Sequence, residues 1–182
     1  MAGSKRVMIF IDGSNLYHAL KAALGNASID FEHLAAALVG PDRELVRVYY
    51  YNAPVNQQEV PEQYKRQQSF LSGIKRLPYY EVKLGRLVRR PQGMVEKGVD
   101  VKLATDMVAA GLRDRYDVAV LVSGDGDFAD AVQVVKDAGK HVELAYPAKA
   151  KPADALLDAC DIFIDLIEKT HLKAVRRSST PR

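Results

Sequence analysis

Two short, wholly apolar runs that end in acidic turns constrain the fold of this chain most strongly. Residues 7–11 read Val-Met-Ile-Phe-Ile before Asp12, and residues 118–122 read Val-Ala-Val-Leu-Val before the turn of residues 123–127. An unbroken apolar run of this length is typical of a strand that is buried on both faces, as in a parallel sheet. The two runs therefore predict strands in the interior of an α/β domain.

Helix and strand patterns alternate along the rest of the chain. Helices are expected from residue 13 to about 24 and over residues 31–39, 62–77, 98–112, 128–138 and 153–159. Further strands are expected over residues 45–51, 79–84, 141–146 and 162–164, with a return through Gly85 into residues 86–88. This order predicts a mainly parallel sheet covered by helices on both faces.

Composition excludes several other classes of protein. The 182 residues suit one domain, and 48% hydrophobic with 27% charged residues excludes wholesale disorder. No apolar run approaches the ~20 residues of a membrane helix, and residues 1–6 are too short and polar for a signal peptide. The single cysteine, Cys160, forms no internal disulfide, and no Cys/His spacing indicates zinc. We therefore expect a cytoplasmic protein without a membrane partner.

Charge is distributed unevenly along the chain. Between residues 62 and 97, nine Lys or Arg residues oppose three Glu, and residues 169–182 add five basic residues and no acid. The remainder carries a net charge of −8. A chain that separates acids from bases in this way can hold cations beside a polyanion, although charged helix surfaces are also common. We expect one domain over residues 1–168 and a disordered basic tail over 169–182, which either adds electrostatic affinity or solubilises the terminus.

Acidic residues follow both apolar runs. Asp12 ends the first run, and Asp125 and Asp127 lie in the turn after the second. Ligands of open parallel sheets bind beyond the carboxyl ends of the strands, so neighbouring strands would bring these three carboxylates together. Close like charges repel unless a cation neutralises them, and oxygen ligands at an open site favour Mg²⁺ or Mn²⁺ over zinc. Turn and helix-cap roles are the alternative for each residue.

The helix predicted from residue 98 carries two further aspartates. Asp100 lies in its first turn and is the better metal-ligand candidate, although the helix dipole alone also favours an acid there. Asp106 falls within the apolar stripe, about 9 Å further along the axis, and either orients a metal ligand or is hydrogen-bonded internally.

Other polar residues have weaker signals. Asn15 and Ser123 can reach the same crevice and donate to a phosphate, although capping is the commoner role of both. The residues Tyr49-Tyr50-Tyr51 could stack bases, but packing at the end of a strand is more common. The four histidines are scattered and indicate structural or surface positions. A P-loop motif and a complete calcium loop are absent from the sequence.

Three motifs together resemble a known family. They are residues 10–16 (FIDGSNL), 97–107 (KGVDVKLATDM) and 121–128 (LVSGDGDF), and residues 139–143 match a later strand entry. From about residue 7 to 165, the chain closely resembles the NYN domain, LabA-like branch, of the PIN-like nuclease superfamily. The resemblance implies a three-layer α/β/α Rossmann-like (PIN-like) fold and Mg²⁺- or Mn²⁺-dependent RNA cleavage. It assigns metal roles to Asp12, Asp100, Asp125 and Asp127, and Asn15 supports the first acid; relatives often carry proline where Asp130 stands.

The expected function is metal-assisted hydrolysis of single-stranded or flexible RNA. The residues expected to bind phosphates are basic, namely Lys97, Lys65, Arg66, Lys75 and Arg76. The alternative is a non-cutting RNA-binding or regulatory module with the same fold. A Toprim domain would need Glu at Asp12, and a haloacid-dehalogenase-type phosphatase would need Asp at Ser14, so both rank low. The oligomeric state is open, and a homo-oligomer is compatible with the sequence.

Overall fold

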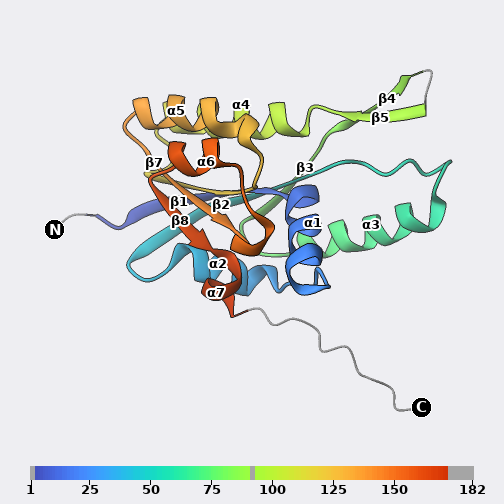
Figure 1. Ribbon diagram of the computed structural model, residues 1–182, viewed down its shortest axis with the longest axis horizontal. Coiled ribbons are helices and arrows are strands. Elements are labelled where there is room, and N and C mark those ends of the chain that lie inside the picture. The colour runs from blue at the N-terminus through green and yellow to red at the C-terminus, as the bar shows by residue number, and fades with distance from the viewer. Residues whose placement is uncertain (1–2, 91–92, 172–182) are drawn as a thin grey trace, which may run out of the picture.

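A parallel sheet forms the centre of the protein, whose computed structural model describes residues 3–90 and 93–171. Within these residues the sheet has six strands in the order β3-β2-β1-β6-β7-β8, and all of its pairings are parallel (Figure 1). The strands are β1 (Lys5–Asp12), β2 (Arg43–Asn52), β3 (Tyr80–Leu84), β6 (Val118–Val122), β7 (His141–Tyr146) and β8 (Ile162–Asp165). The two apolar runs are β1 and β6, and they lie side by side as expected.

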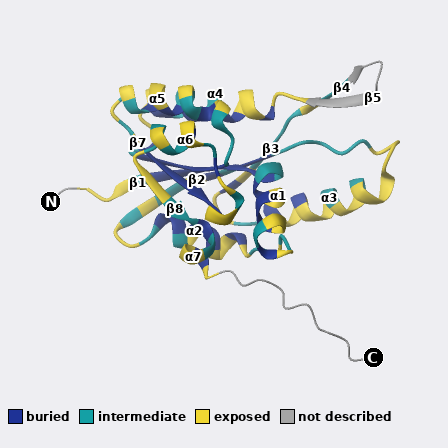
Figure 2. Ribbon diagram, viewed as in Figure 1, coloured by how far each residue is buried: buried dark blue, intermediate teal, exposed yellow. Residues whose placement is uncertain are grey.

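Helices cover both faces of the sheet, which confirms the three-layer α/β/α class. On one face lie α1 (Gly13–Leu24), α2 (Phe31–Val39), α3 (Pro61–Ile74) and α7 (Leu166–Thr170). On the other lie α4 (Val99–Leu112), α5 (Ala129–Asp137) and α6 (Asp154–Ala159), together with the short 3₁₀ turn η1 (Gly126–Phe128). A second 3₁₀ turn, η2 (Ala148–Ala150), follows β7 and contacts α1. The central strands β1, β6 and β7 are almost wholly buried between these layers, whereas the outer strands β2, β3 and β8 are partly exposed (Figure 2).

Strand β1 divides its side chains between two hydrophobic cores. Val7, Ile9 and Ile11 pack with helices α1 and α2, whereas Met8 and Phe10 pack with α4 and α5. Successive side chains of a strand point to opposite faces, so an unbroken apolar run is required when helices cover both. This explains why the sequence pattern identified the strand.

The order of the strands creates a crevice between β1 and β6. From β1 the chain moves outward through β2 to β3, and it then returns to β6 and moves outward in the opposite direction through β7 to β8. The connections that follow β1 and β6 therefore diverge to opposite faces of the sheet. A crevice at such a switch point is where open α/β sheets bind ligands.

The main difference from the expected elements is an additional hairpin. Strands β4 (Arg86–Arg90) and β5 (Gly93–Lys97) pair with each other in a separate antiparallel sheet. Residues 86–88, which were expected to follow Gly85 as a returning strand, form part of β4. The partner of β4 is β5, which was not expected. The hairpin projects from the three layers on the side where α3 begins (Figure 1).

An ion pair fixes β1 against β6 at the end opposite the crevice. The Arg6 side chain donates to Asp117 through Nη2 (2.8 Å) and Nε (3.2 Å), and the Arg6 backbone N–H also donates to that carboxylate (2.7 Å). In return, the Asp117 N–H donates to the Arg6 carbonyl (2.9 Å). These bonds from Arg6 lower the pKa of Asp117 to about 2.

We expect Asp117→Asn to lower the thermal unfolding midpoint by a few degrees at neutral pH. Because the folded-state pKa lies below that of the unfolded chain (about 3.9), the carboxylate stabilises the fold above pH 4 and loses this effect as pH falls toward 2. The midpoint difference between wild type and variant should therefore shrink below pH 4. Calorimetry across this range measures it, with exposed Asp158→Asn as the control; a pH-independent difference would contradict the assignment.

The expected boundary near residue 168 falls within helix α7, whose Leu166 is buried in the core. Of the predicted disordered tail, residues 169 and 170 are helical in α7, and residues 172–182 lie outside the described residues. In the part of the chain that the structure describes, none of the helices combines the length and apolar character needed to span a bilayer.

Candidate metal and nucleic-acid site

The structure places the four predicted metal ligands around the crevice between β1 and β6. Asp12 ends β1, Asp125 and Asp127 follow β6, and Asp100 lies in the first turn of α4. Each of these elements reaches the crevice from a different part of the chain. Asp100 and Asp125 both raise the pKa of Asp12, and Asp125 and Asp127 both raise the pKa of Asp100. The four carboxylates therefore form one electrostatically coupled group.

Asp12 combines a helix-capping role with burial. Its Oδ1 accepts the backbone N–H of Asn15 (3.0 Å) and thereby caps α1. Only 5% of the residue is exposed, and this burial is the main cause of its raised pKa. The turn and cap reading of Asp12 is thus correct, but capping occupies one carboxylate oxygen and leaves Oδ2 facing Ser123.

Asp125 repeats this arrangement on the neighbouring strand. Its Oδ1 accepts the N–H of Asp127 (3.0 Å) at the start of η1. Asp127 and Asp100 are exposed, whereas Asp125 is half-buried. Burial is the largest cause of the raised pKa of Asp100, followed by the charges of Asp125 and Asp127. None of the causes of this pKa shift is a neighbouring basic side chain, so negative charge is concentrated at Asp100.

Asn15 and Ser123 join the two acidic strand ends. The backbone N–H of Gly124 donates to Asn15 Oδ1 (2.9 Å), which ties α1 to the loop after β6. The Ser123 hydroxyl accepts the N–H of Asp125 (3.2 Å) and lies 3.5 Å from Asp12 Oδ2. Ser123 is fully buried, so it positions the two aspartates instead of presenting its hydroxyl to a phosphate as expected.

Two glycines allow tyrosine rings to close around the acids. A Cβ on Gly13 would overlap the Tyr50 ring, and one on Gly124 would overlap the Tyr146 ring. Burial is the main cause of the raised pKa of Tyr146, and the charges of Asp12 and Asp125 add to it. The glycines of both motifs thus provide the close approach of ring to backbone.

A cleft of about 320 Å³ opens over two of the four acids, Asp12 and Asp100. Its lining includes Asp12, Asp100, Asn15 and Lys97, together with residues of α1 and β7. Lys97 is exposed at the end of β5 and stands at this cleft as expected. An amine at the rim of an acidic cleft can attract a phosphate without neutralising every carboxylate.

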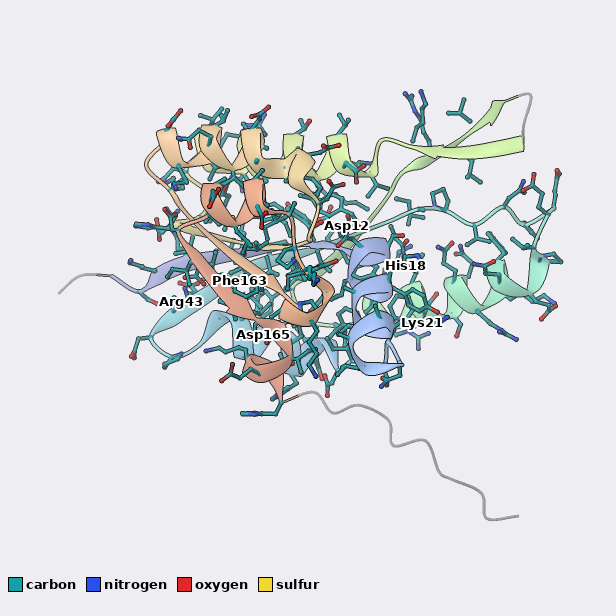
Figure 3. The ribbon with its side chains drawn as sticks, in the orientation of Figure 1. Asp12, His18, Lys21, Arg43, Phe163 and Asp165 are labelled. Carbon is teal, nitrogen blue, oxygen red and sulfur yellow. The ribbon has the colours of Figure 1, made fainter. Side chains whose placement is uncertain are left out.

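Sequence reasoning missed two residues that line the cleft, His18 and Tyr146. Figure 3 shows His18 on the same helix as the capped turn at Asp12. His18 lies one helical turn beyond Ser14 and Asn15, so helical spacing would have placed it on the same face. Tyr146 ends β7, and the strand-end argument applied to Asp12 would also have found it. The other three histidines lie away from this lining.

Asp106 lies elsewhere than the four coupled aspartates. It pairs with Lys83 (2.9 Å) and accepts a hydrogen bond from the Tyr51 hydroxyl (2.9 Å). These contacts place it between α4 and the β2–β3 side of the sheet, which supports the internally hydrogen-bonded alternative. Orientation of a metal ligand by Asp106 has no support from the contacts that the described residues make.

The predicted phosphate-binding residues divide into two groups. Lys65 and Arg66 lie in the first half of α3, and Arg66 lines a hollow beside the cleft. Lys75 and Arg76 follow the end of α3 and precede β3, which runs parallel to β1. They therefore lie at the edge of the sheet where strands begin, opposite Asp12, and this corrects their assignment to the site.

The tyrosines of β2 mainly pack in the protein interior, which was the more common of the two roles considered for them. Tyr50 and Tyr51 are buried, and Tyr49 is half-buried. Asp130 is exposed in the first turn of α5.

The chemistry of the donor set fits a hard divalent cation. All four candidate ligands are carboxylates, and burial, with mutual repulsion as a smaller cause, raises the pKa values of Asp12 and Asp100. Among the described residues, no group of three acidic, His or Cys side chains is close enough to hold an ion unaided. Mg²⁺ is commonly bound through one or two carboxylates, with waters and substrate phosphates completing its shell. The residues present are compatible with that mode of binding.

Comparison with families matches most of the chain to one model. The model described as "NYN domain" matches residues 6–168, which contain all four aspartates and all of the central sheet except Lys5.

One individual protein and one solved structure are similar to this chain over most of its length. The "Low amplitude and bright protein LabA" of Synechococcus elongatus is 27% identical over 184 residues, which cover 91% of this chain and 89% of that protein. The crystal structure of a protein of unknown function from Vibrio parahaemolyticus superimposes with a TM-score of 0.70 at 22% identity. It covers 90% of this chain and 94% of that one, and it supports the fold.

Proposed function

Because the chain belongs to the NYN domain family, part of the PIN-like nuclease superfamily, we propose that it is a metal-dependent ribonuclease. The observation that carries the proposal is the coupled group of four aspartates at the switch point of the sheet. The substrate is single-stranded or flexible RNA, and the ion is Mg²⁺ or Mn²⁺. The choice of ion rests on the oxygen-only donor set, and the choice of RNA rests on membership of the NYN domain family together with the cationic surroundings.

The ion would be held by carboxylates drawn from Asp12, Asp100, Asp125 and Asp127, with waters and the substrate phosphate completing its shell. When bound there, Mg²⁺ or Mn²⁺ would lower the pKa of a water molecule and would neutralise negative charge on the phosphate and the leaving oxygen. The protein's own contribution is to fix the carboxylates. Asn15 and Ser123 provide this through their bonds to the two strand ends.

The basic residues bind the polyanion and position it. Lys97 at the rim of the cleft attracts the phosphate, and Arg66 and Lys65 extend the cationic surface along α3. Phosphate contacts of this kind supply affinity that is independent of sequence and falls as salt increases. No serine, cysteine or histidine nucleophile is needed for this chemistry.

We expect purified protein to cleave a labelled single-stranded RNA in Mn²⁺ or Mg²⁺, and EDTA to abolish cleavage until excess Mn²⁺ is added. Gel electrophoresis of the products measures this. A preparation of Asp125→Asn, purified in parallel, controls for contaminating ribonucleases and should be inactive. Salt-dependent RNA binding without cleavage in any divalent ion would contradict the proposal and would favour the non-cutting module.

A further inference from the structure

A second hollow, of about 660 Å³, adjoins the acidic cleft. It lies between the first turns of α1, the segment that follows β2 and the first half of α3. Ser14 and His18 line both this hollow and the acidic cleft. A chain that occupies the cleft can therefore extend directly into the hollow. We call the hollow the α1–α3 groove.

Aromatic rings form much of the α1–α3 groove. Phe31 contacts Tyr50 and Phe70 edge-to-face, with ring centroids 5.5 and 5.8 Å apart, and Tyr50 contacts Phe70 at 5.8 Å. Phe70 remains 42% exposed, and Tyr17 on the α1 side is 49% exposed. Exposed aromatic rings, one of them supported by buried rings, in a concave and largely apolar site indicate a ligand that buries a flat surface.

Tyr50 connects this groove to the acids. Its ring fills the space left by Gly13, the residue directly after Asp12. Burial is the main cause of the raised pKa of Tyr50, and the charge of Asp12 adds to it. The aromatic part of the α1–α3 groove therefore begins directly beside the carboxylate of Asp12.

Polar groups are placed at the margin of the groove. Gln67 accepts the Val55 N–H (2.9 Å) and donates to the Ala53 carbonyl (2.6 Å), which ties α3 to the segment after β2. Gln63 and Arg66 lie on the same side of α3 and are exposed. The groove thus combines a fixed apolar wall with an amide and a cation at its rim.

From this combination we infer that the α1–α3 groove binds a nucleobase of the RNA strand whose backbone occupies the acidic cleft. The inference rests on the proposed function, which supplies the strand. A nucleobase has a flat apolar face and hydrogen-bonding edges, and the adjoining phosphates match Arg66 and Lys97 in charge. Such a base must be unpaired and unstacked, so the groove selects single-stranded over duplex RNA.

The test compares RNA with a backbone that lacks bases. In EDTA, fluorescence anisotropy measures the Kd of a short labelled single-stranded RNA and of an abasic oligoribonucleotide of the same length. We expect wild type to prefer RNA, and Phe70→Ala to weaken RNA binding about tenfold, since base–aromatic stacking has this size. Binding of the abasic chain should not change.

A matched control separates the groove from general loss of an aromatic surface. Phe163 on β8 is a phenylalanine of similar exposure (39%) that lies away from α1 (Figure 3). Phe163→Ala should bind RNA as wild type does. An equal loss of affinity in both variants, or none in Phe70→Ala, would overturn the inference.

Photocrosslinking tests the same contact without altering the protein. RNA that contains 5-iodouridine should crosslink to peptides that carry Tyr17 or Phe70. Crosslinks confined to other surfaces would overturn the inference that the groove binds a base.

The two proposals can fail separately. RNA cleavage without any base preference would leave the nuclease proposal intact and contradict the groove, whereas a base preference without cleavage would support the groove and contradict the nuclease. Absence of RNA binding would overturn both.

Discussion

Asp12→Asn is expected to lower the rate constant for RNA cleavage about a thousandfold while leaving the fold intact or more stable. Loss of one carboxylate ligand removes several kcal/mol of charge stabilisation, which corresponds to this change in rate. An asparagine side chain still accepts the Asn15 N–H that caps α1. It also removes one charge from a buried, mutually repelling group.

Two measurements on the same preparations check this expectation. Single-turnover cleavage gives the rate, and thermal unfolding in EDTA gives the midpoint, which should equal or exceed that of wild type. Asp30→Asn is the matched control, because Asp30 caps α2 through the His33 N–H (3.0 Å) and lies outside the four-aspartate group. It should retain wild-type activity. An Asp12→Asn variant that cleaves normally would remove Asp12 from the metal site.

Gly13→Ala is expected to lower the free energy of unfolding by about 2 kcal/mol or more. The added methyl group would overlap the ring of Tyr50, which is only 3% exposed and is packed against the rings of Phe31 and Phe70. Overpacking of a core position costs this much, and the better helix propensity of alanine offsets only part of it. Denaturant titration measures the change.

Gly73→Ala on α3 is the matched control for this substitution. A Cβ at Gly73 meets nothing within 4 Å, so the variant should gain up to about 1 kcal/mol from helix propensity. The loss in Gly13→Ala should also shrink in a Tyr50→Val background, because the overlapping ring is then absent. Equal effects of Gly13→Ala and Gly73→Ala would show that Tyr50 is not the cause.

The strands could be predicted because burial on both faces leaves a strong sequence signal. The unbroken apolar runs identified β1 and β6, and the alternation of elements predicted the parallel, three-layer fold. Hairpin strand β5 (Gly93–Lys97) left no such signal. It pairs only with β4, outside the central sheet, so no apolar run was required there.

The sequence placed the acids at one crevice because ligands of parallel sheets bind beyond the carboxyl ends of the strands. The structure adds that the charges of neighbouring acids raise the pKa values of Asp12 and Asp100, after burial as the larger cause. The same rule, applied in reverse, would have separated Lys75 and Arg76 from the site. Residues just before a parallel strand lie at the opposite edge from residues just after one. These two basic side chains are exposed, but their charge contains no information on which end of α3 approaches the cleft.

Contacts between distant residues could not be predicted from local pattern. Asp106 pairs with Lys83 and Tyr51, which are 23 and 55 positions away. The position of Asp106 in an apolar stripe indicates only that a buried carboxylate needs a cation or a hydrogen-bond donor, and the sequence offers several such groups. Likewise, burial of Ser123 depends on how the β6 turn packs against Asp12, which no spacing in the sequence specifies.

The most direct test of the central claim is a Mn²⁺ soak of crystals of this protein, with the ion located by its anomalous scattering. The account predicts a peak in the cleft between β1 and β6, with ligands drawn from Asp12, Asp100, Asp125 and Asp127. A peak elsewhere, or none at Mn²⁺ concentrations that support RNA cleavage, would contradict it.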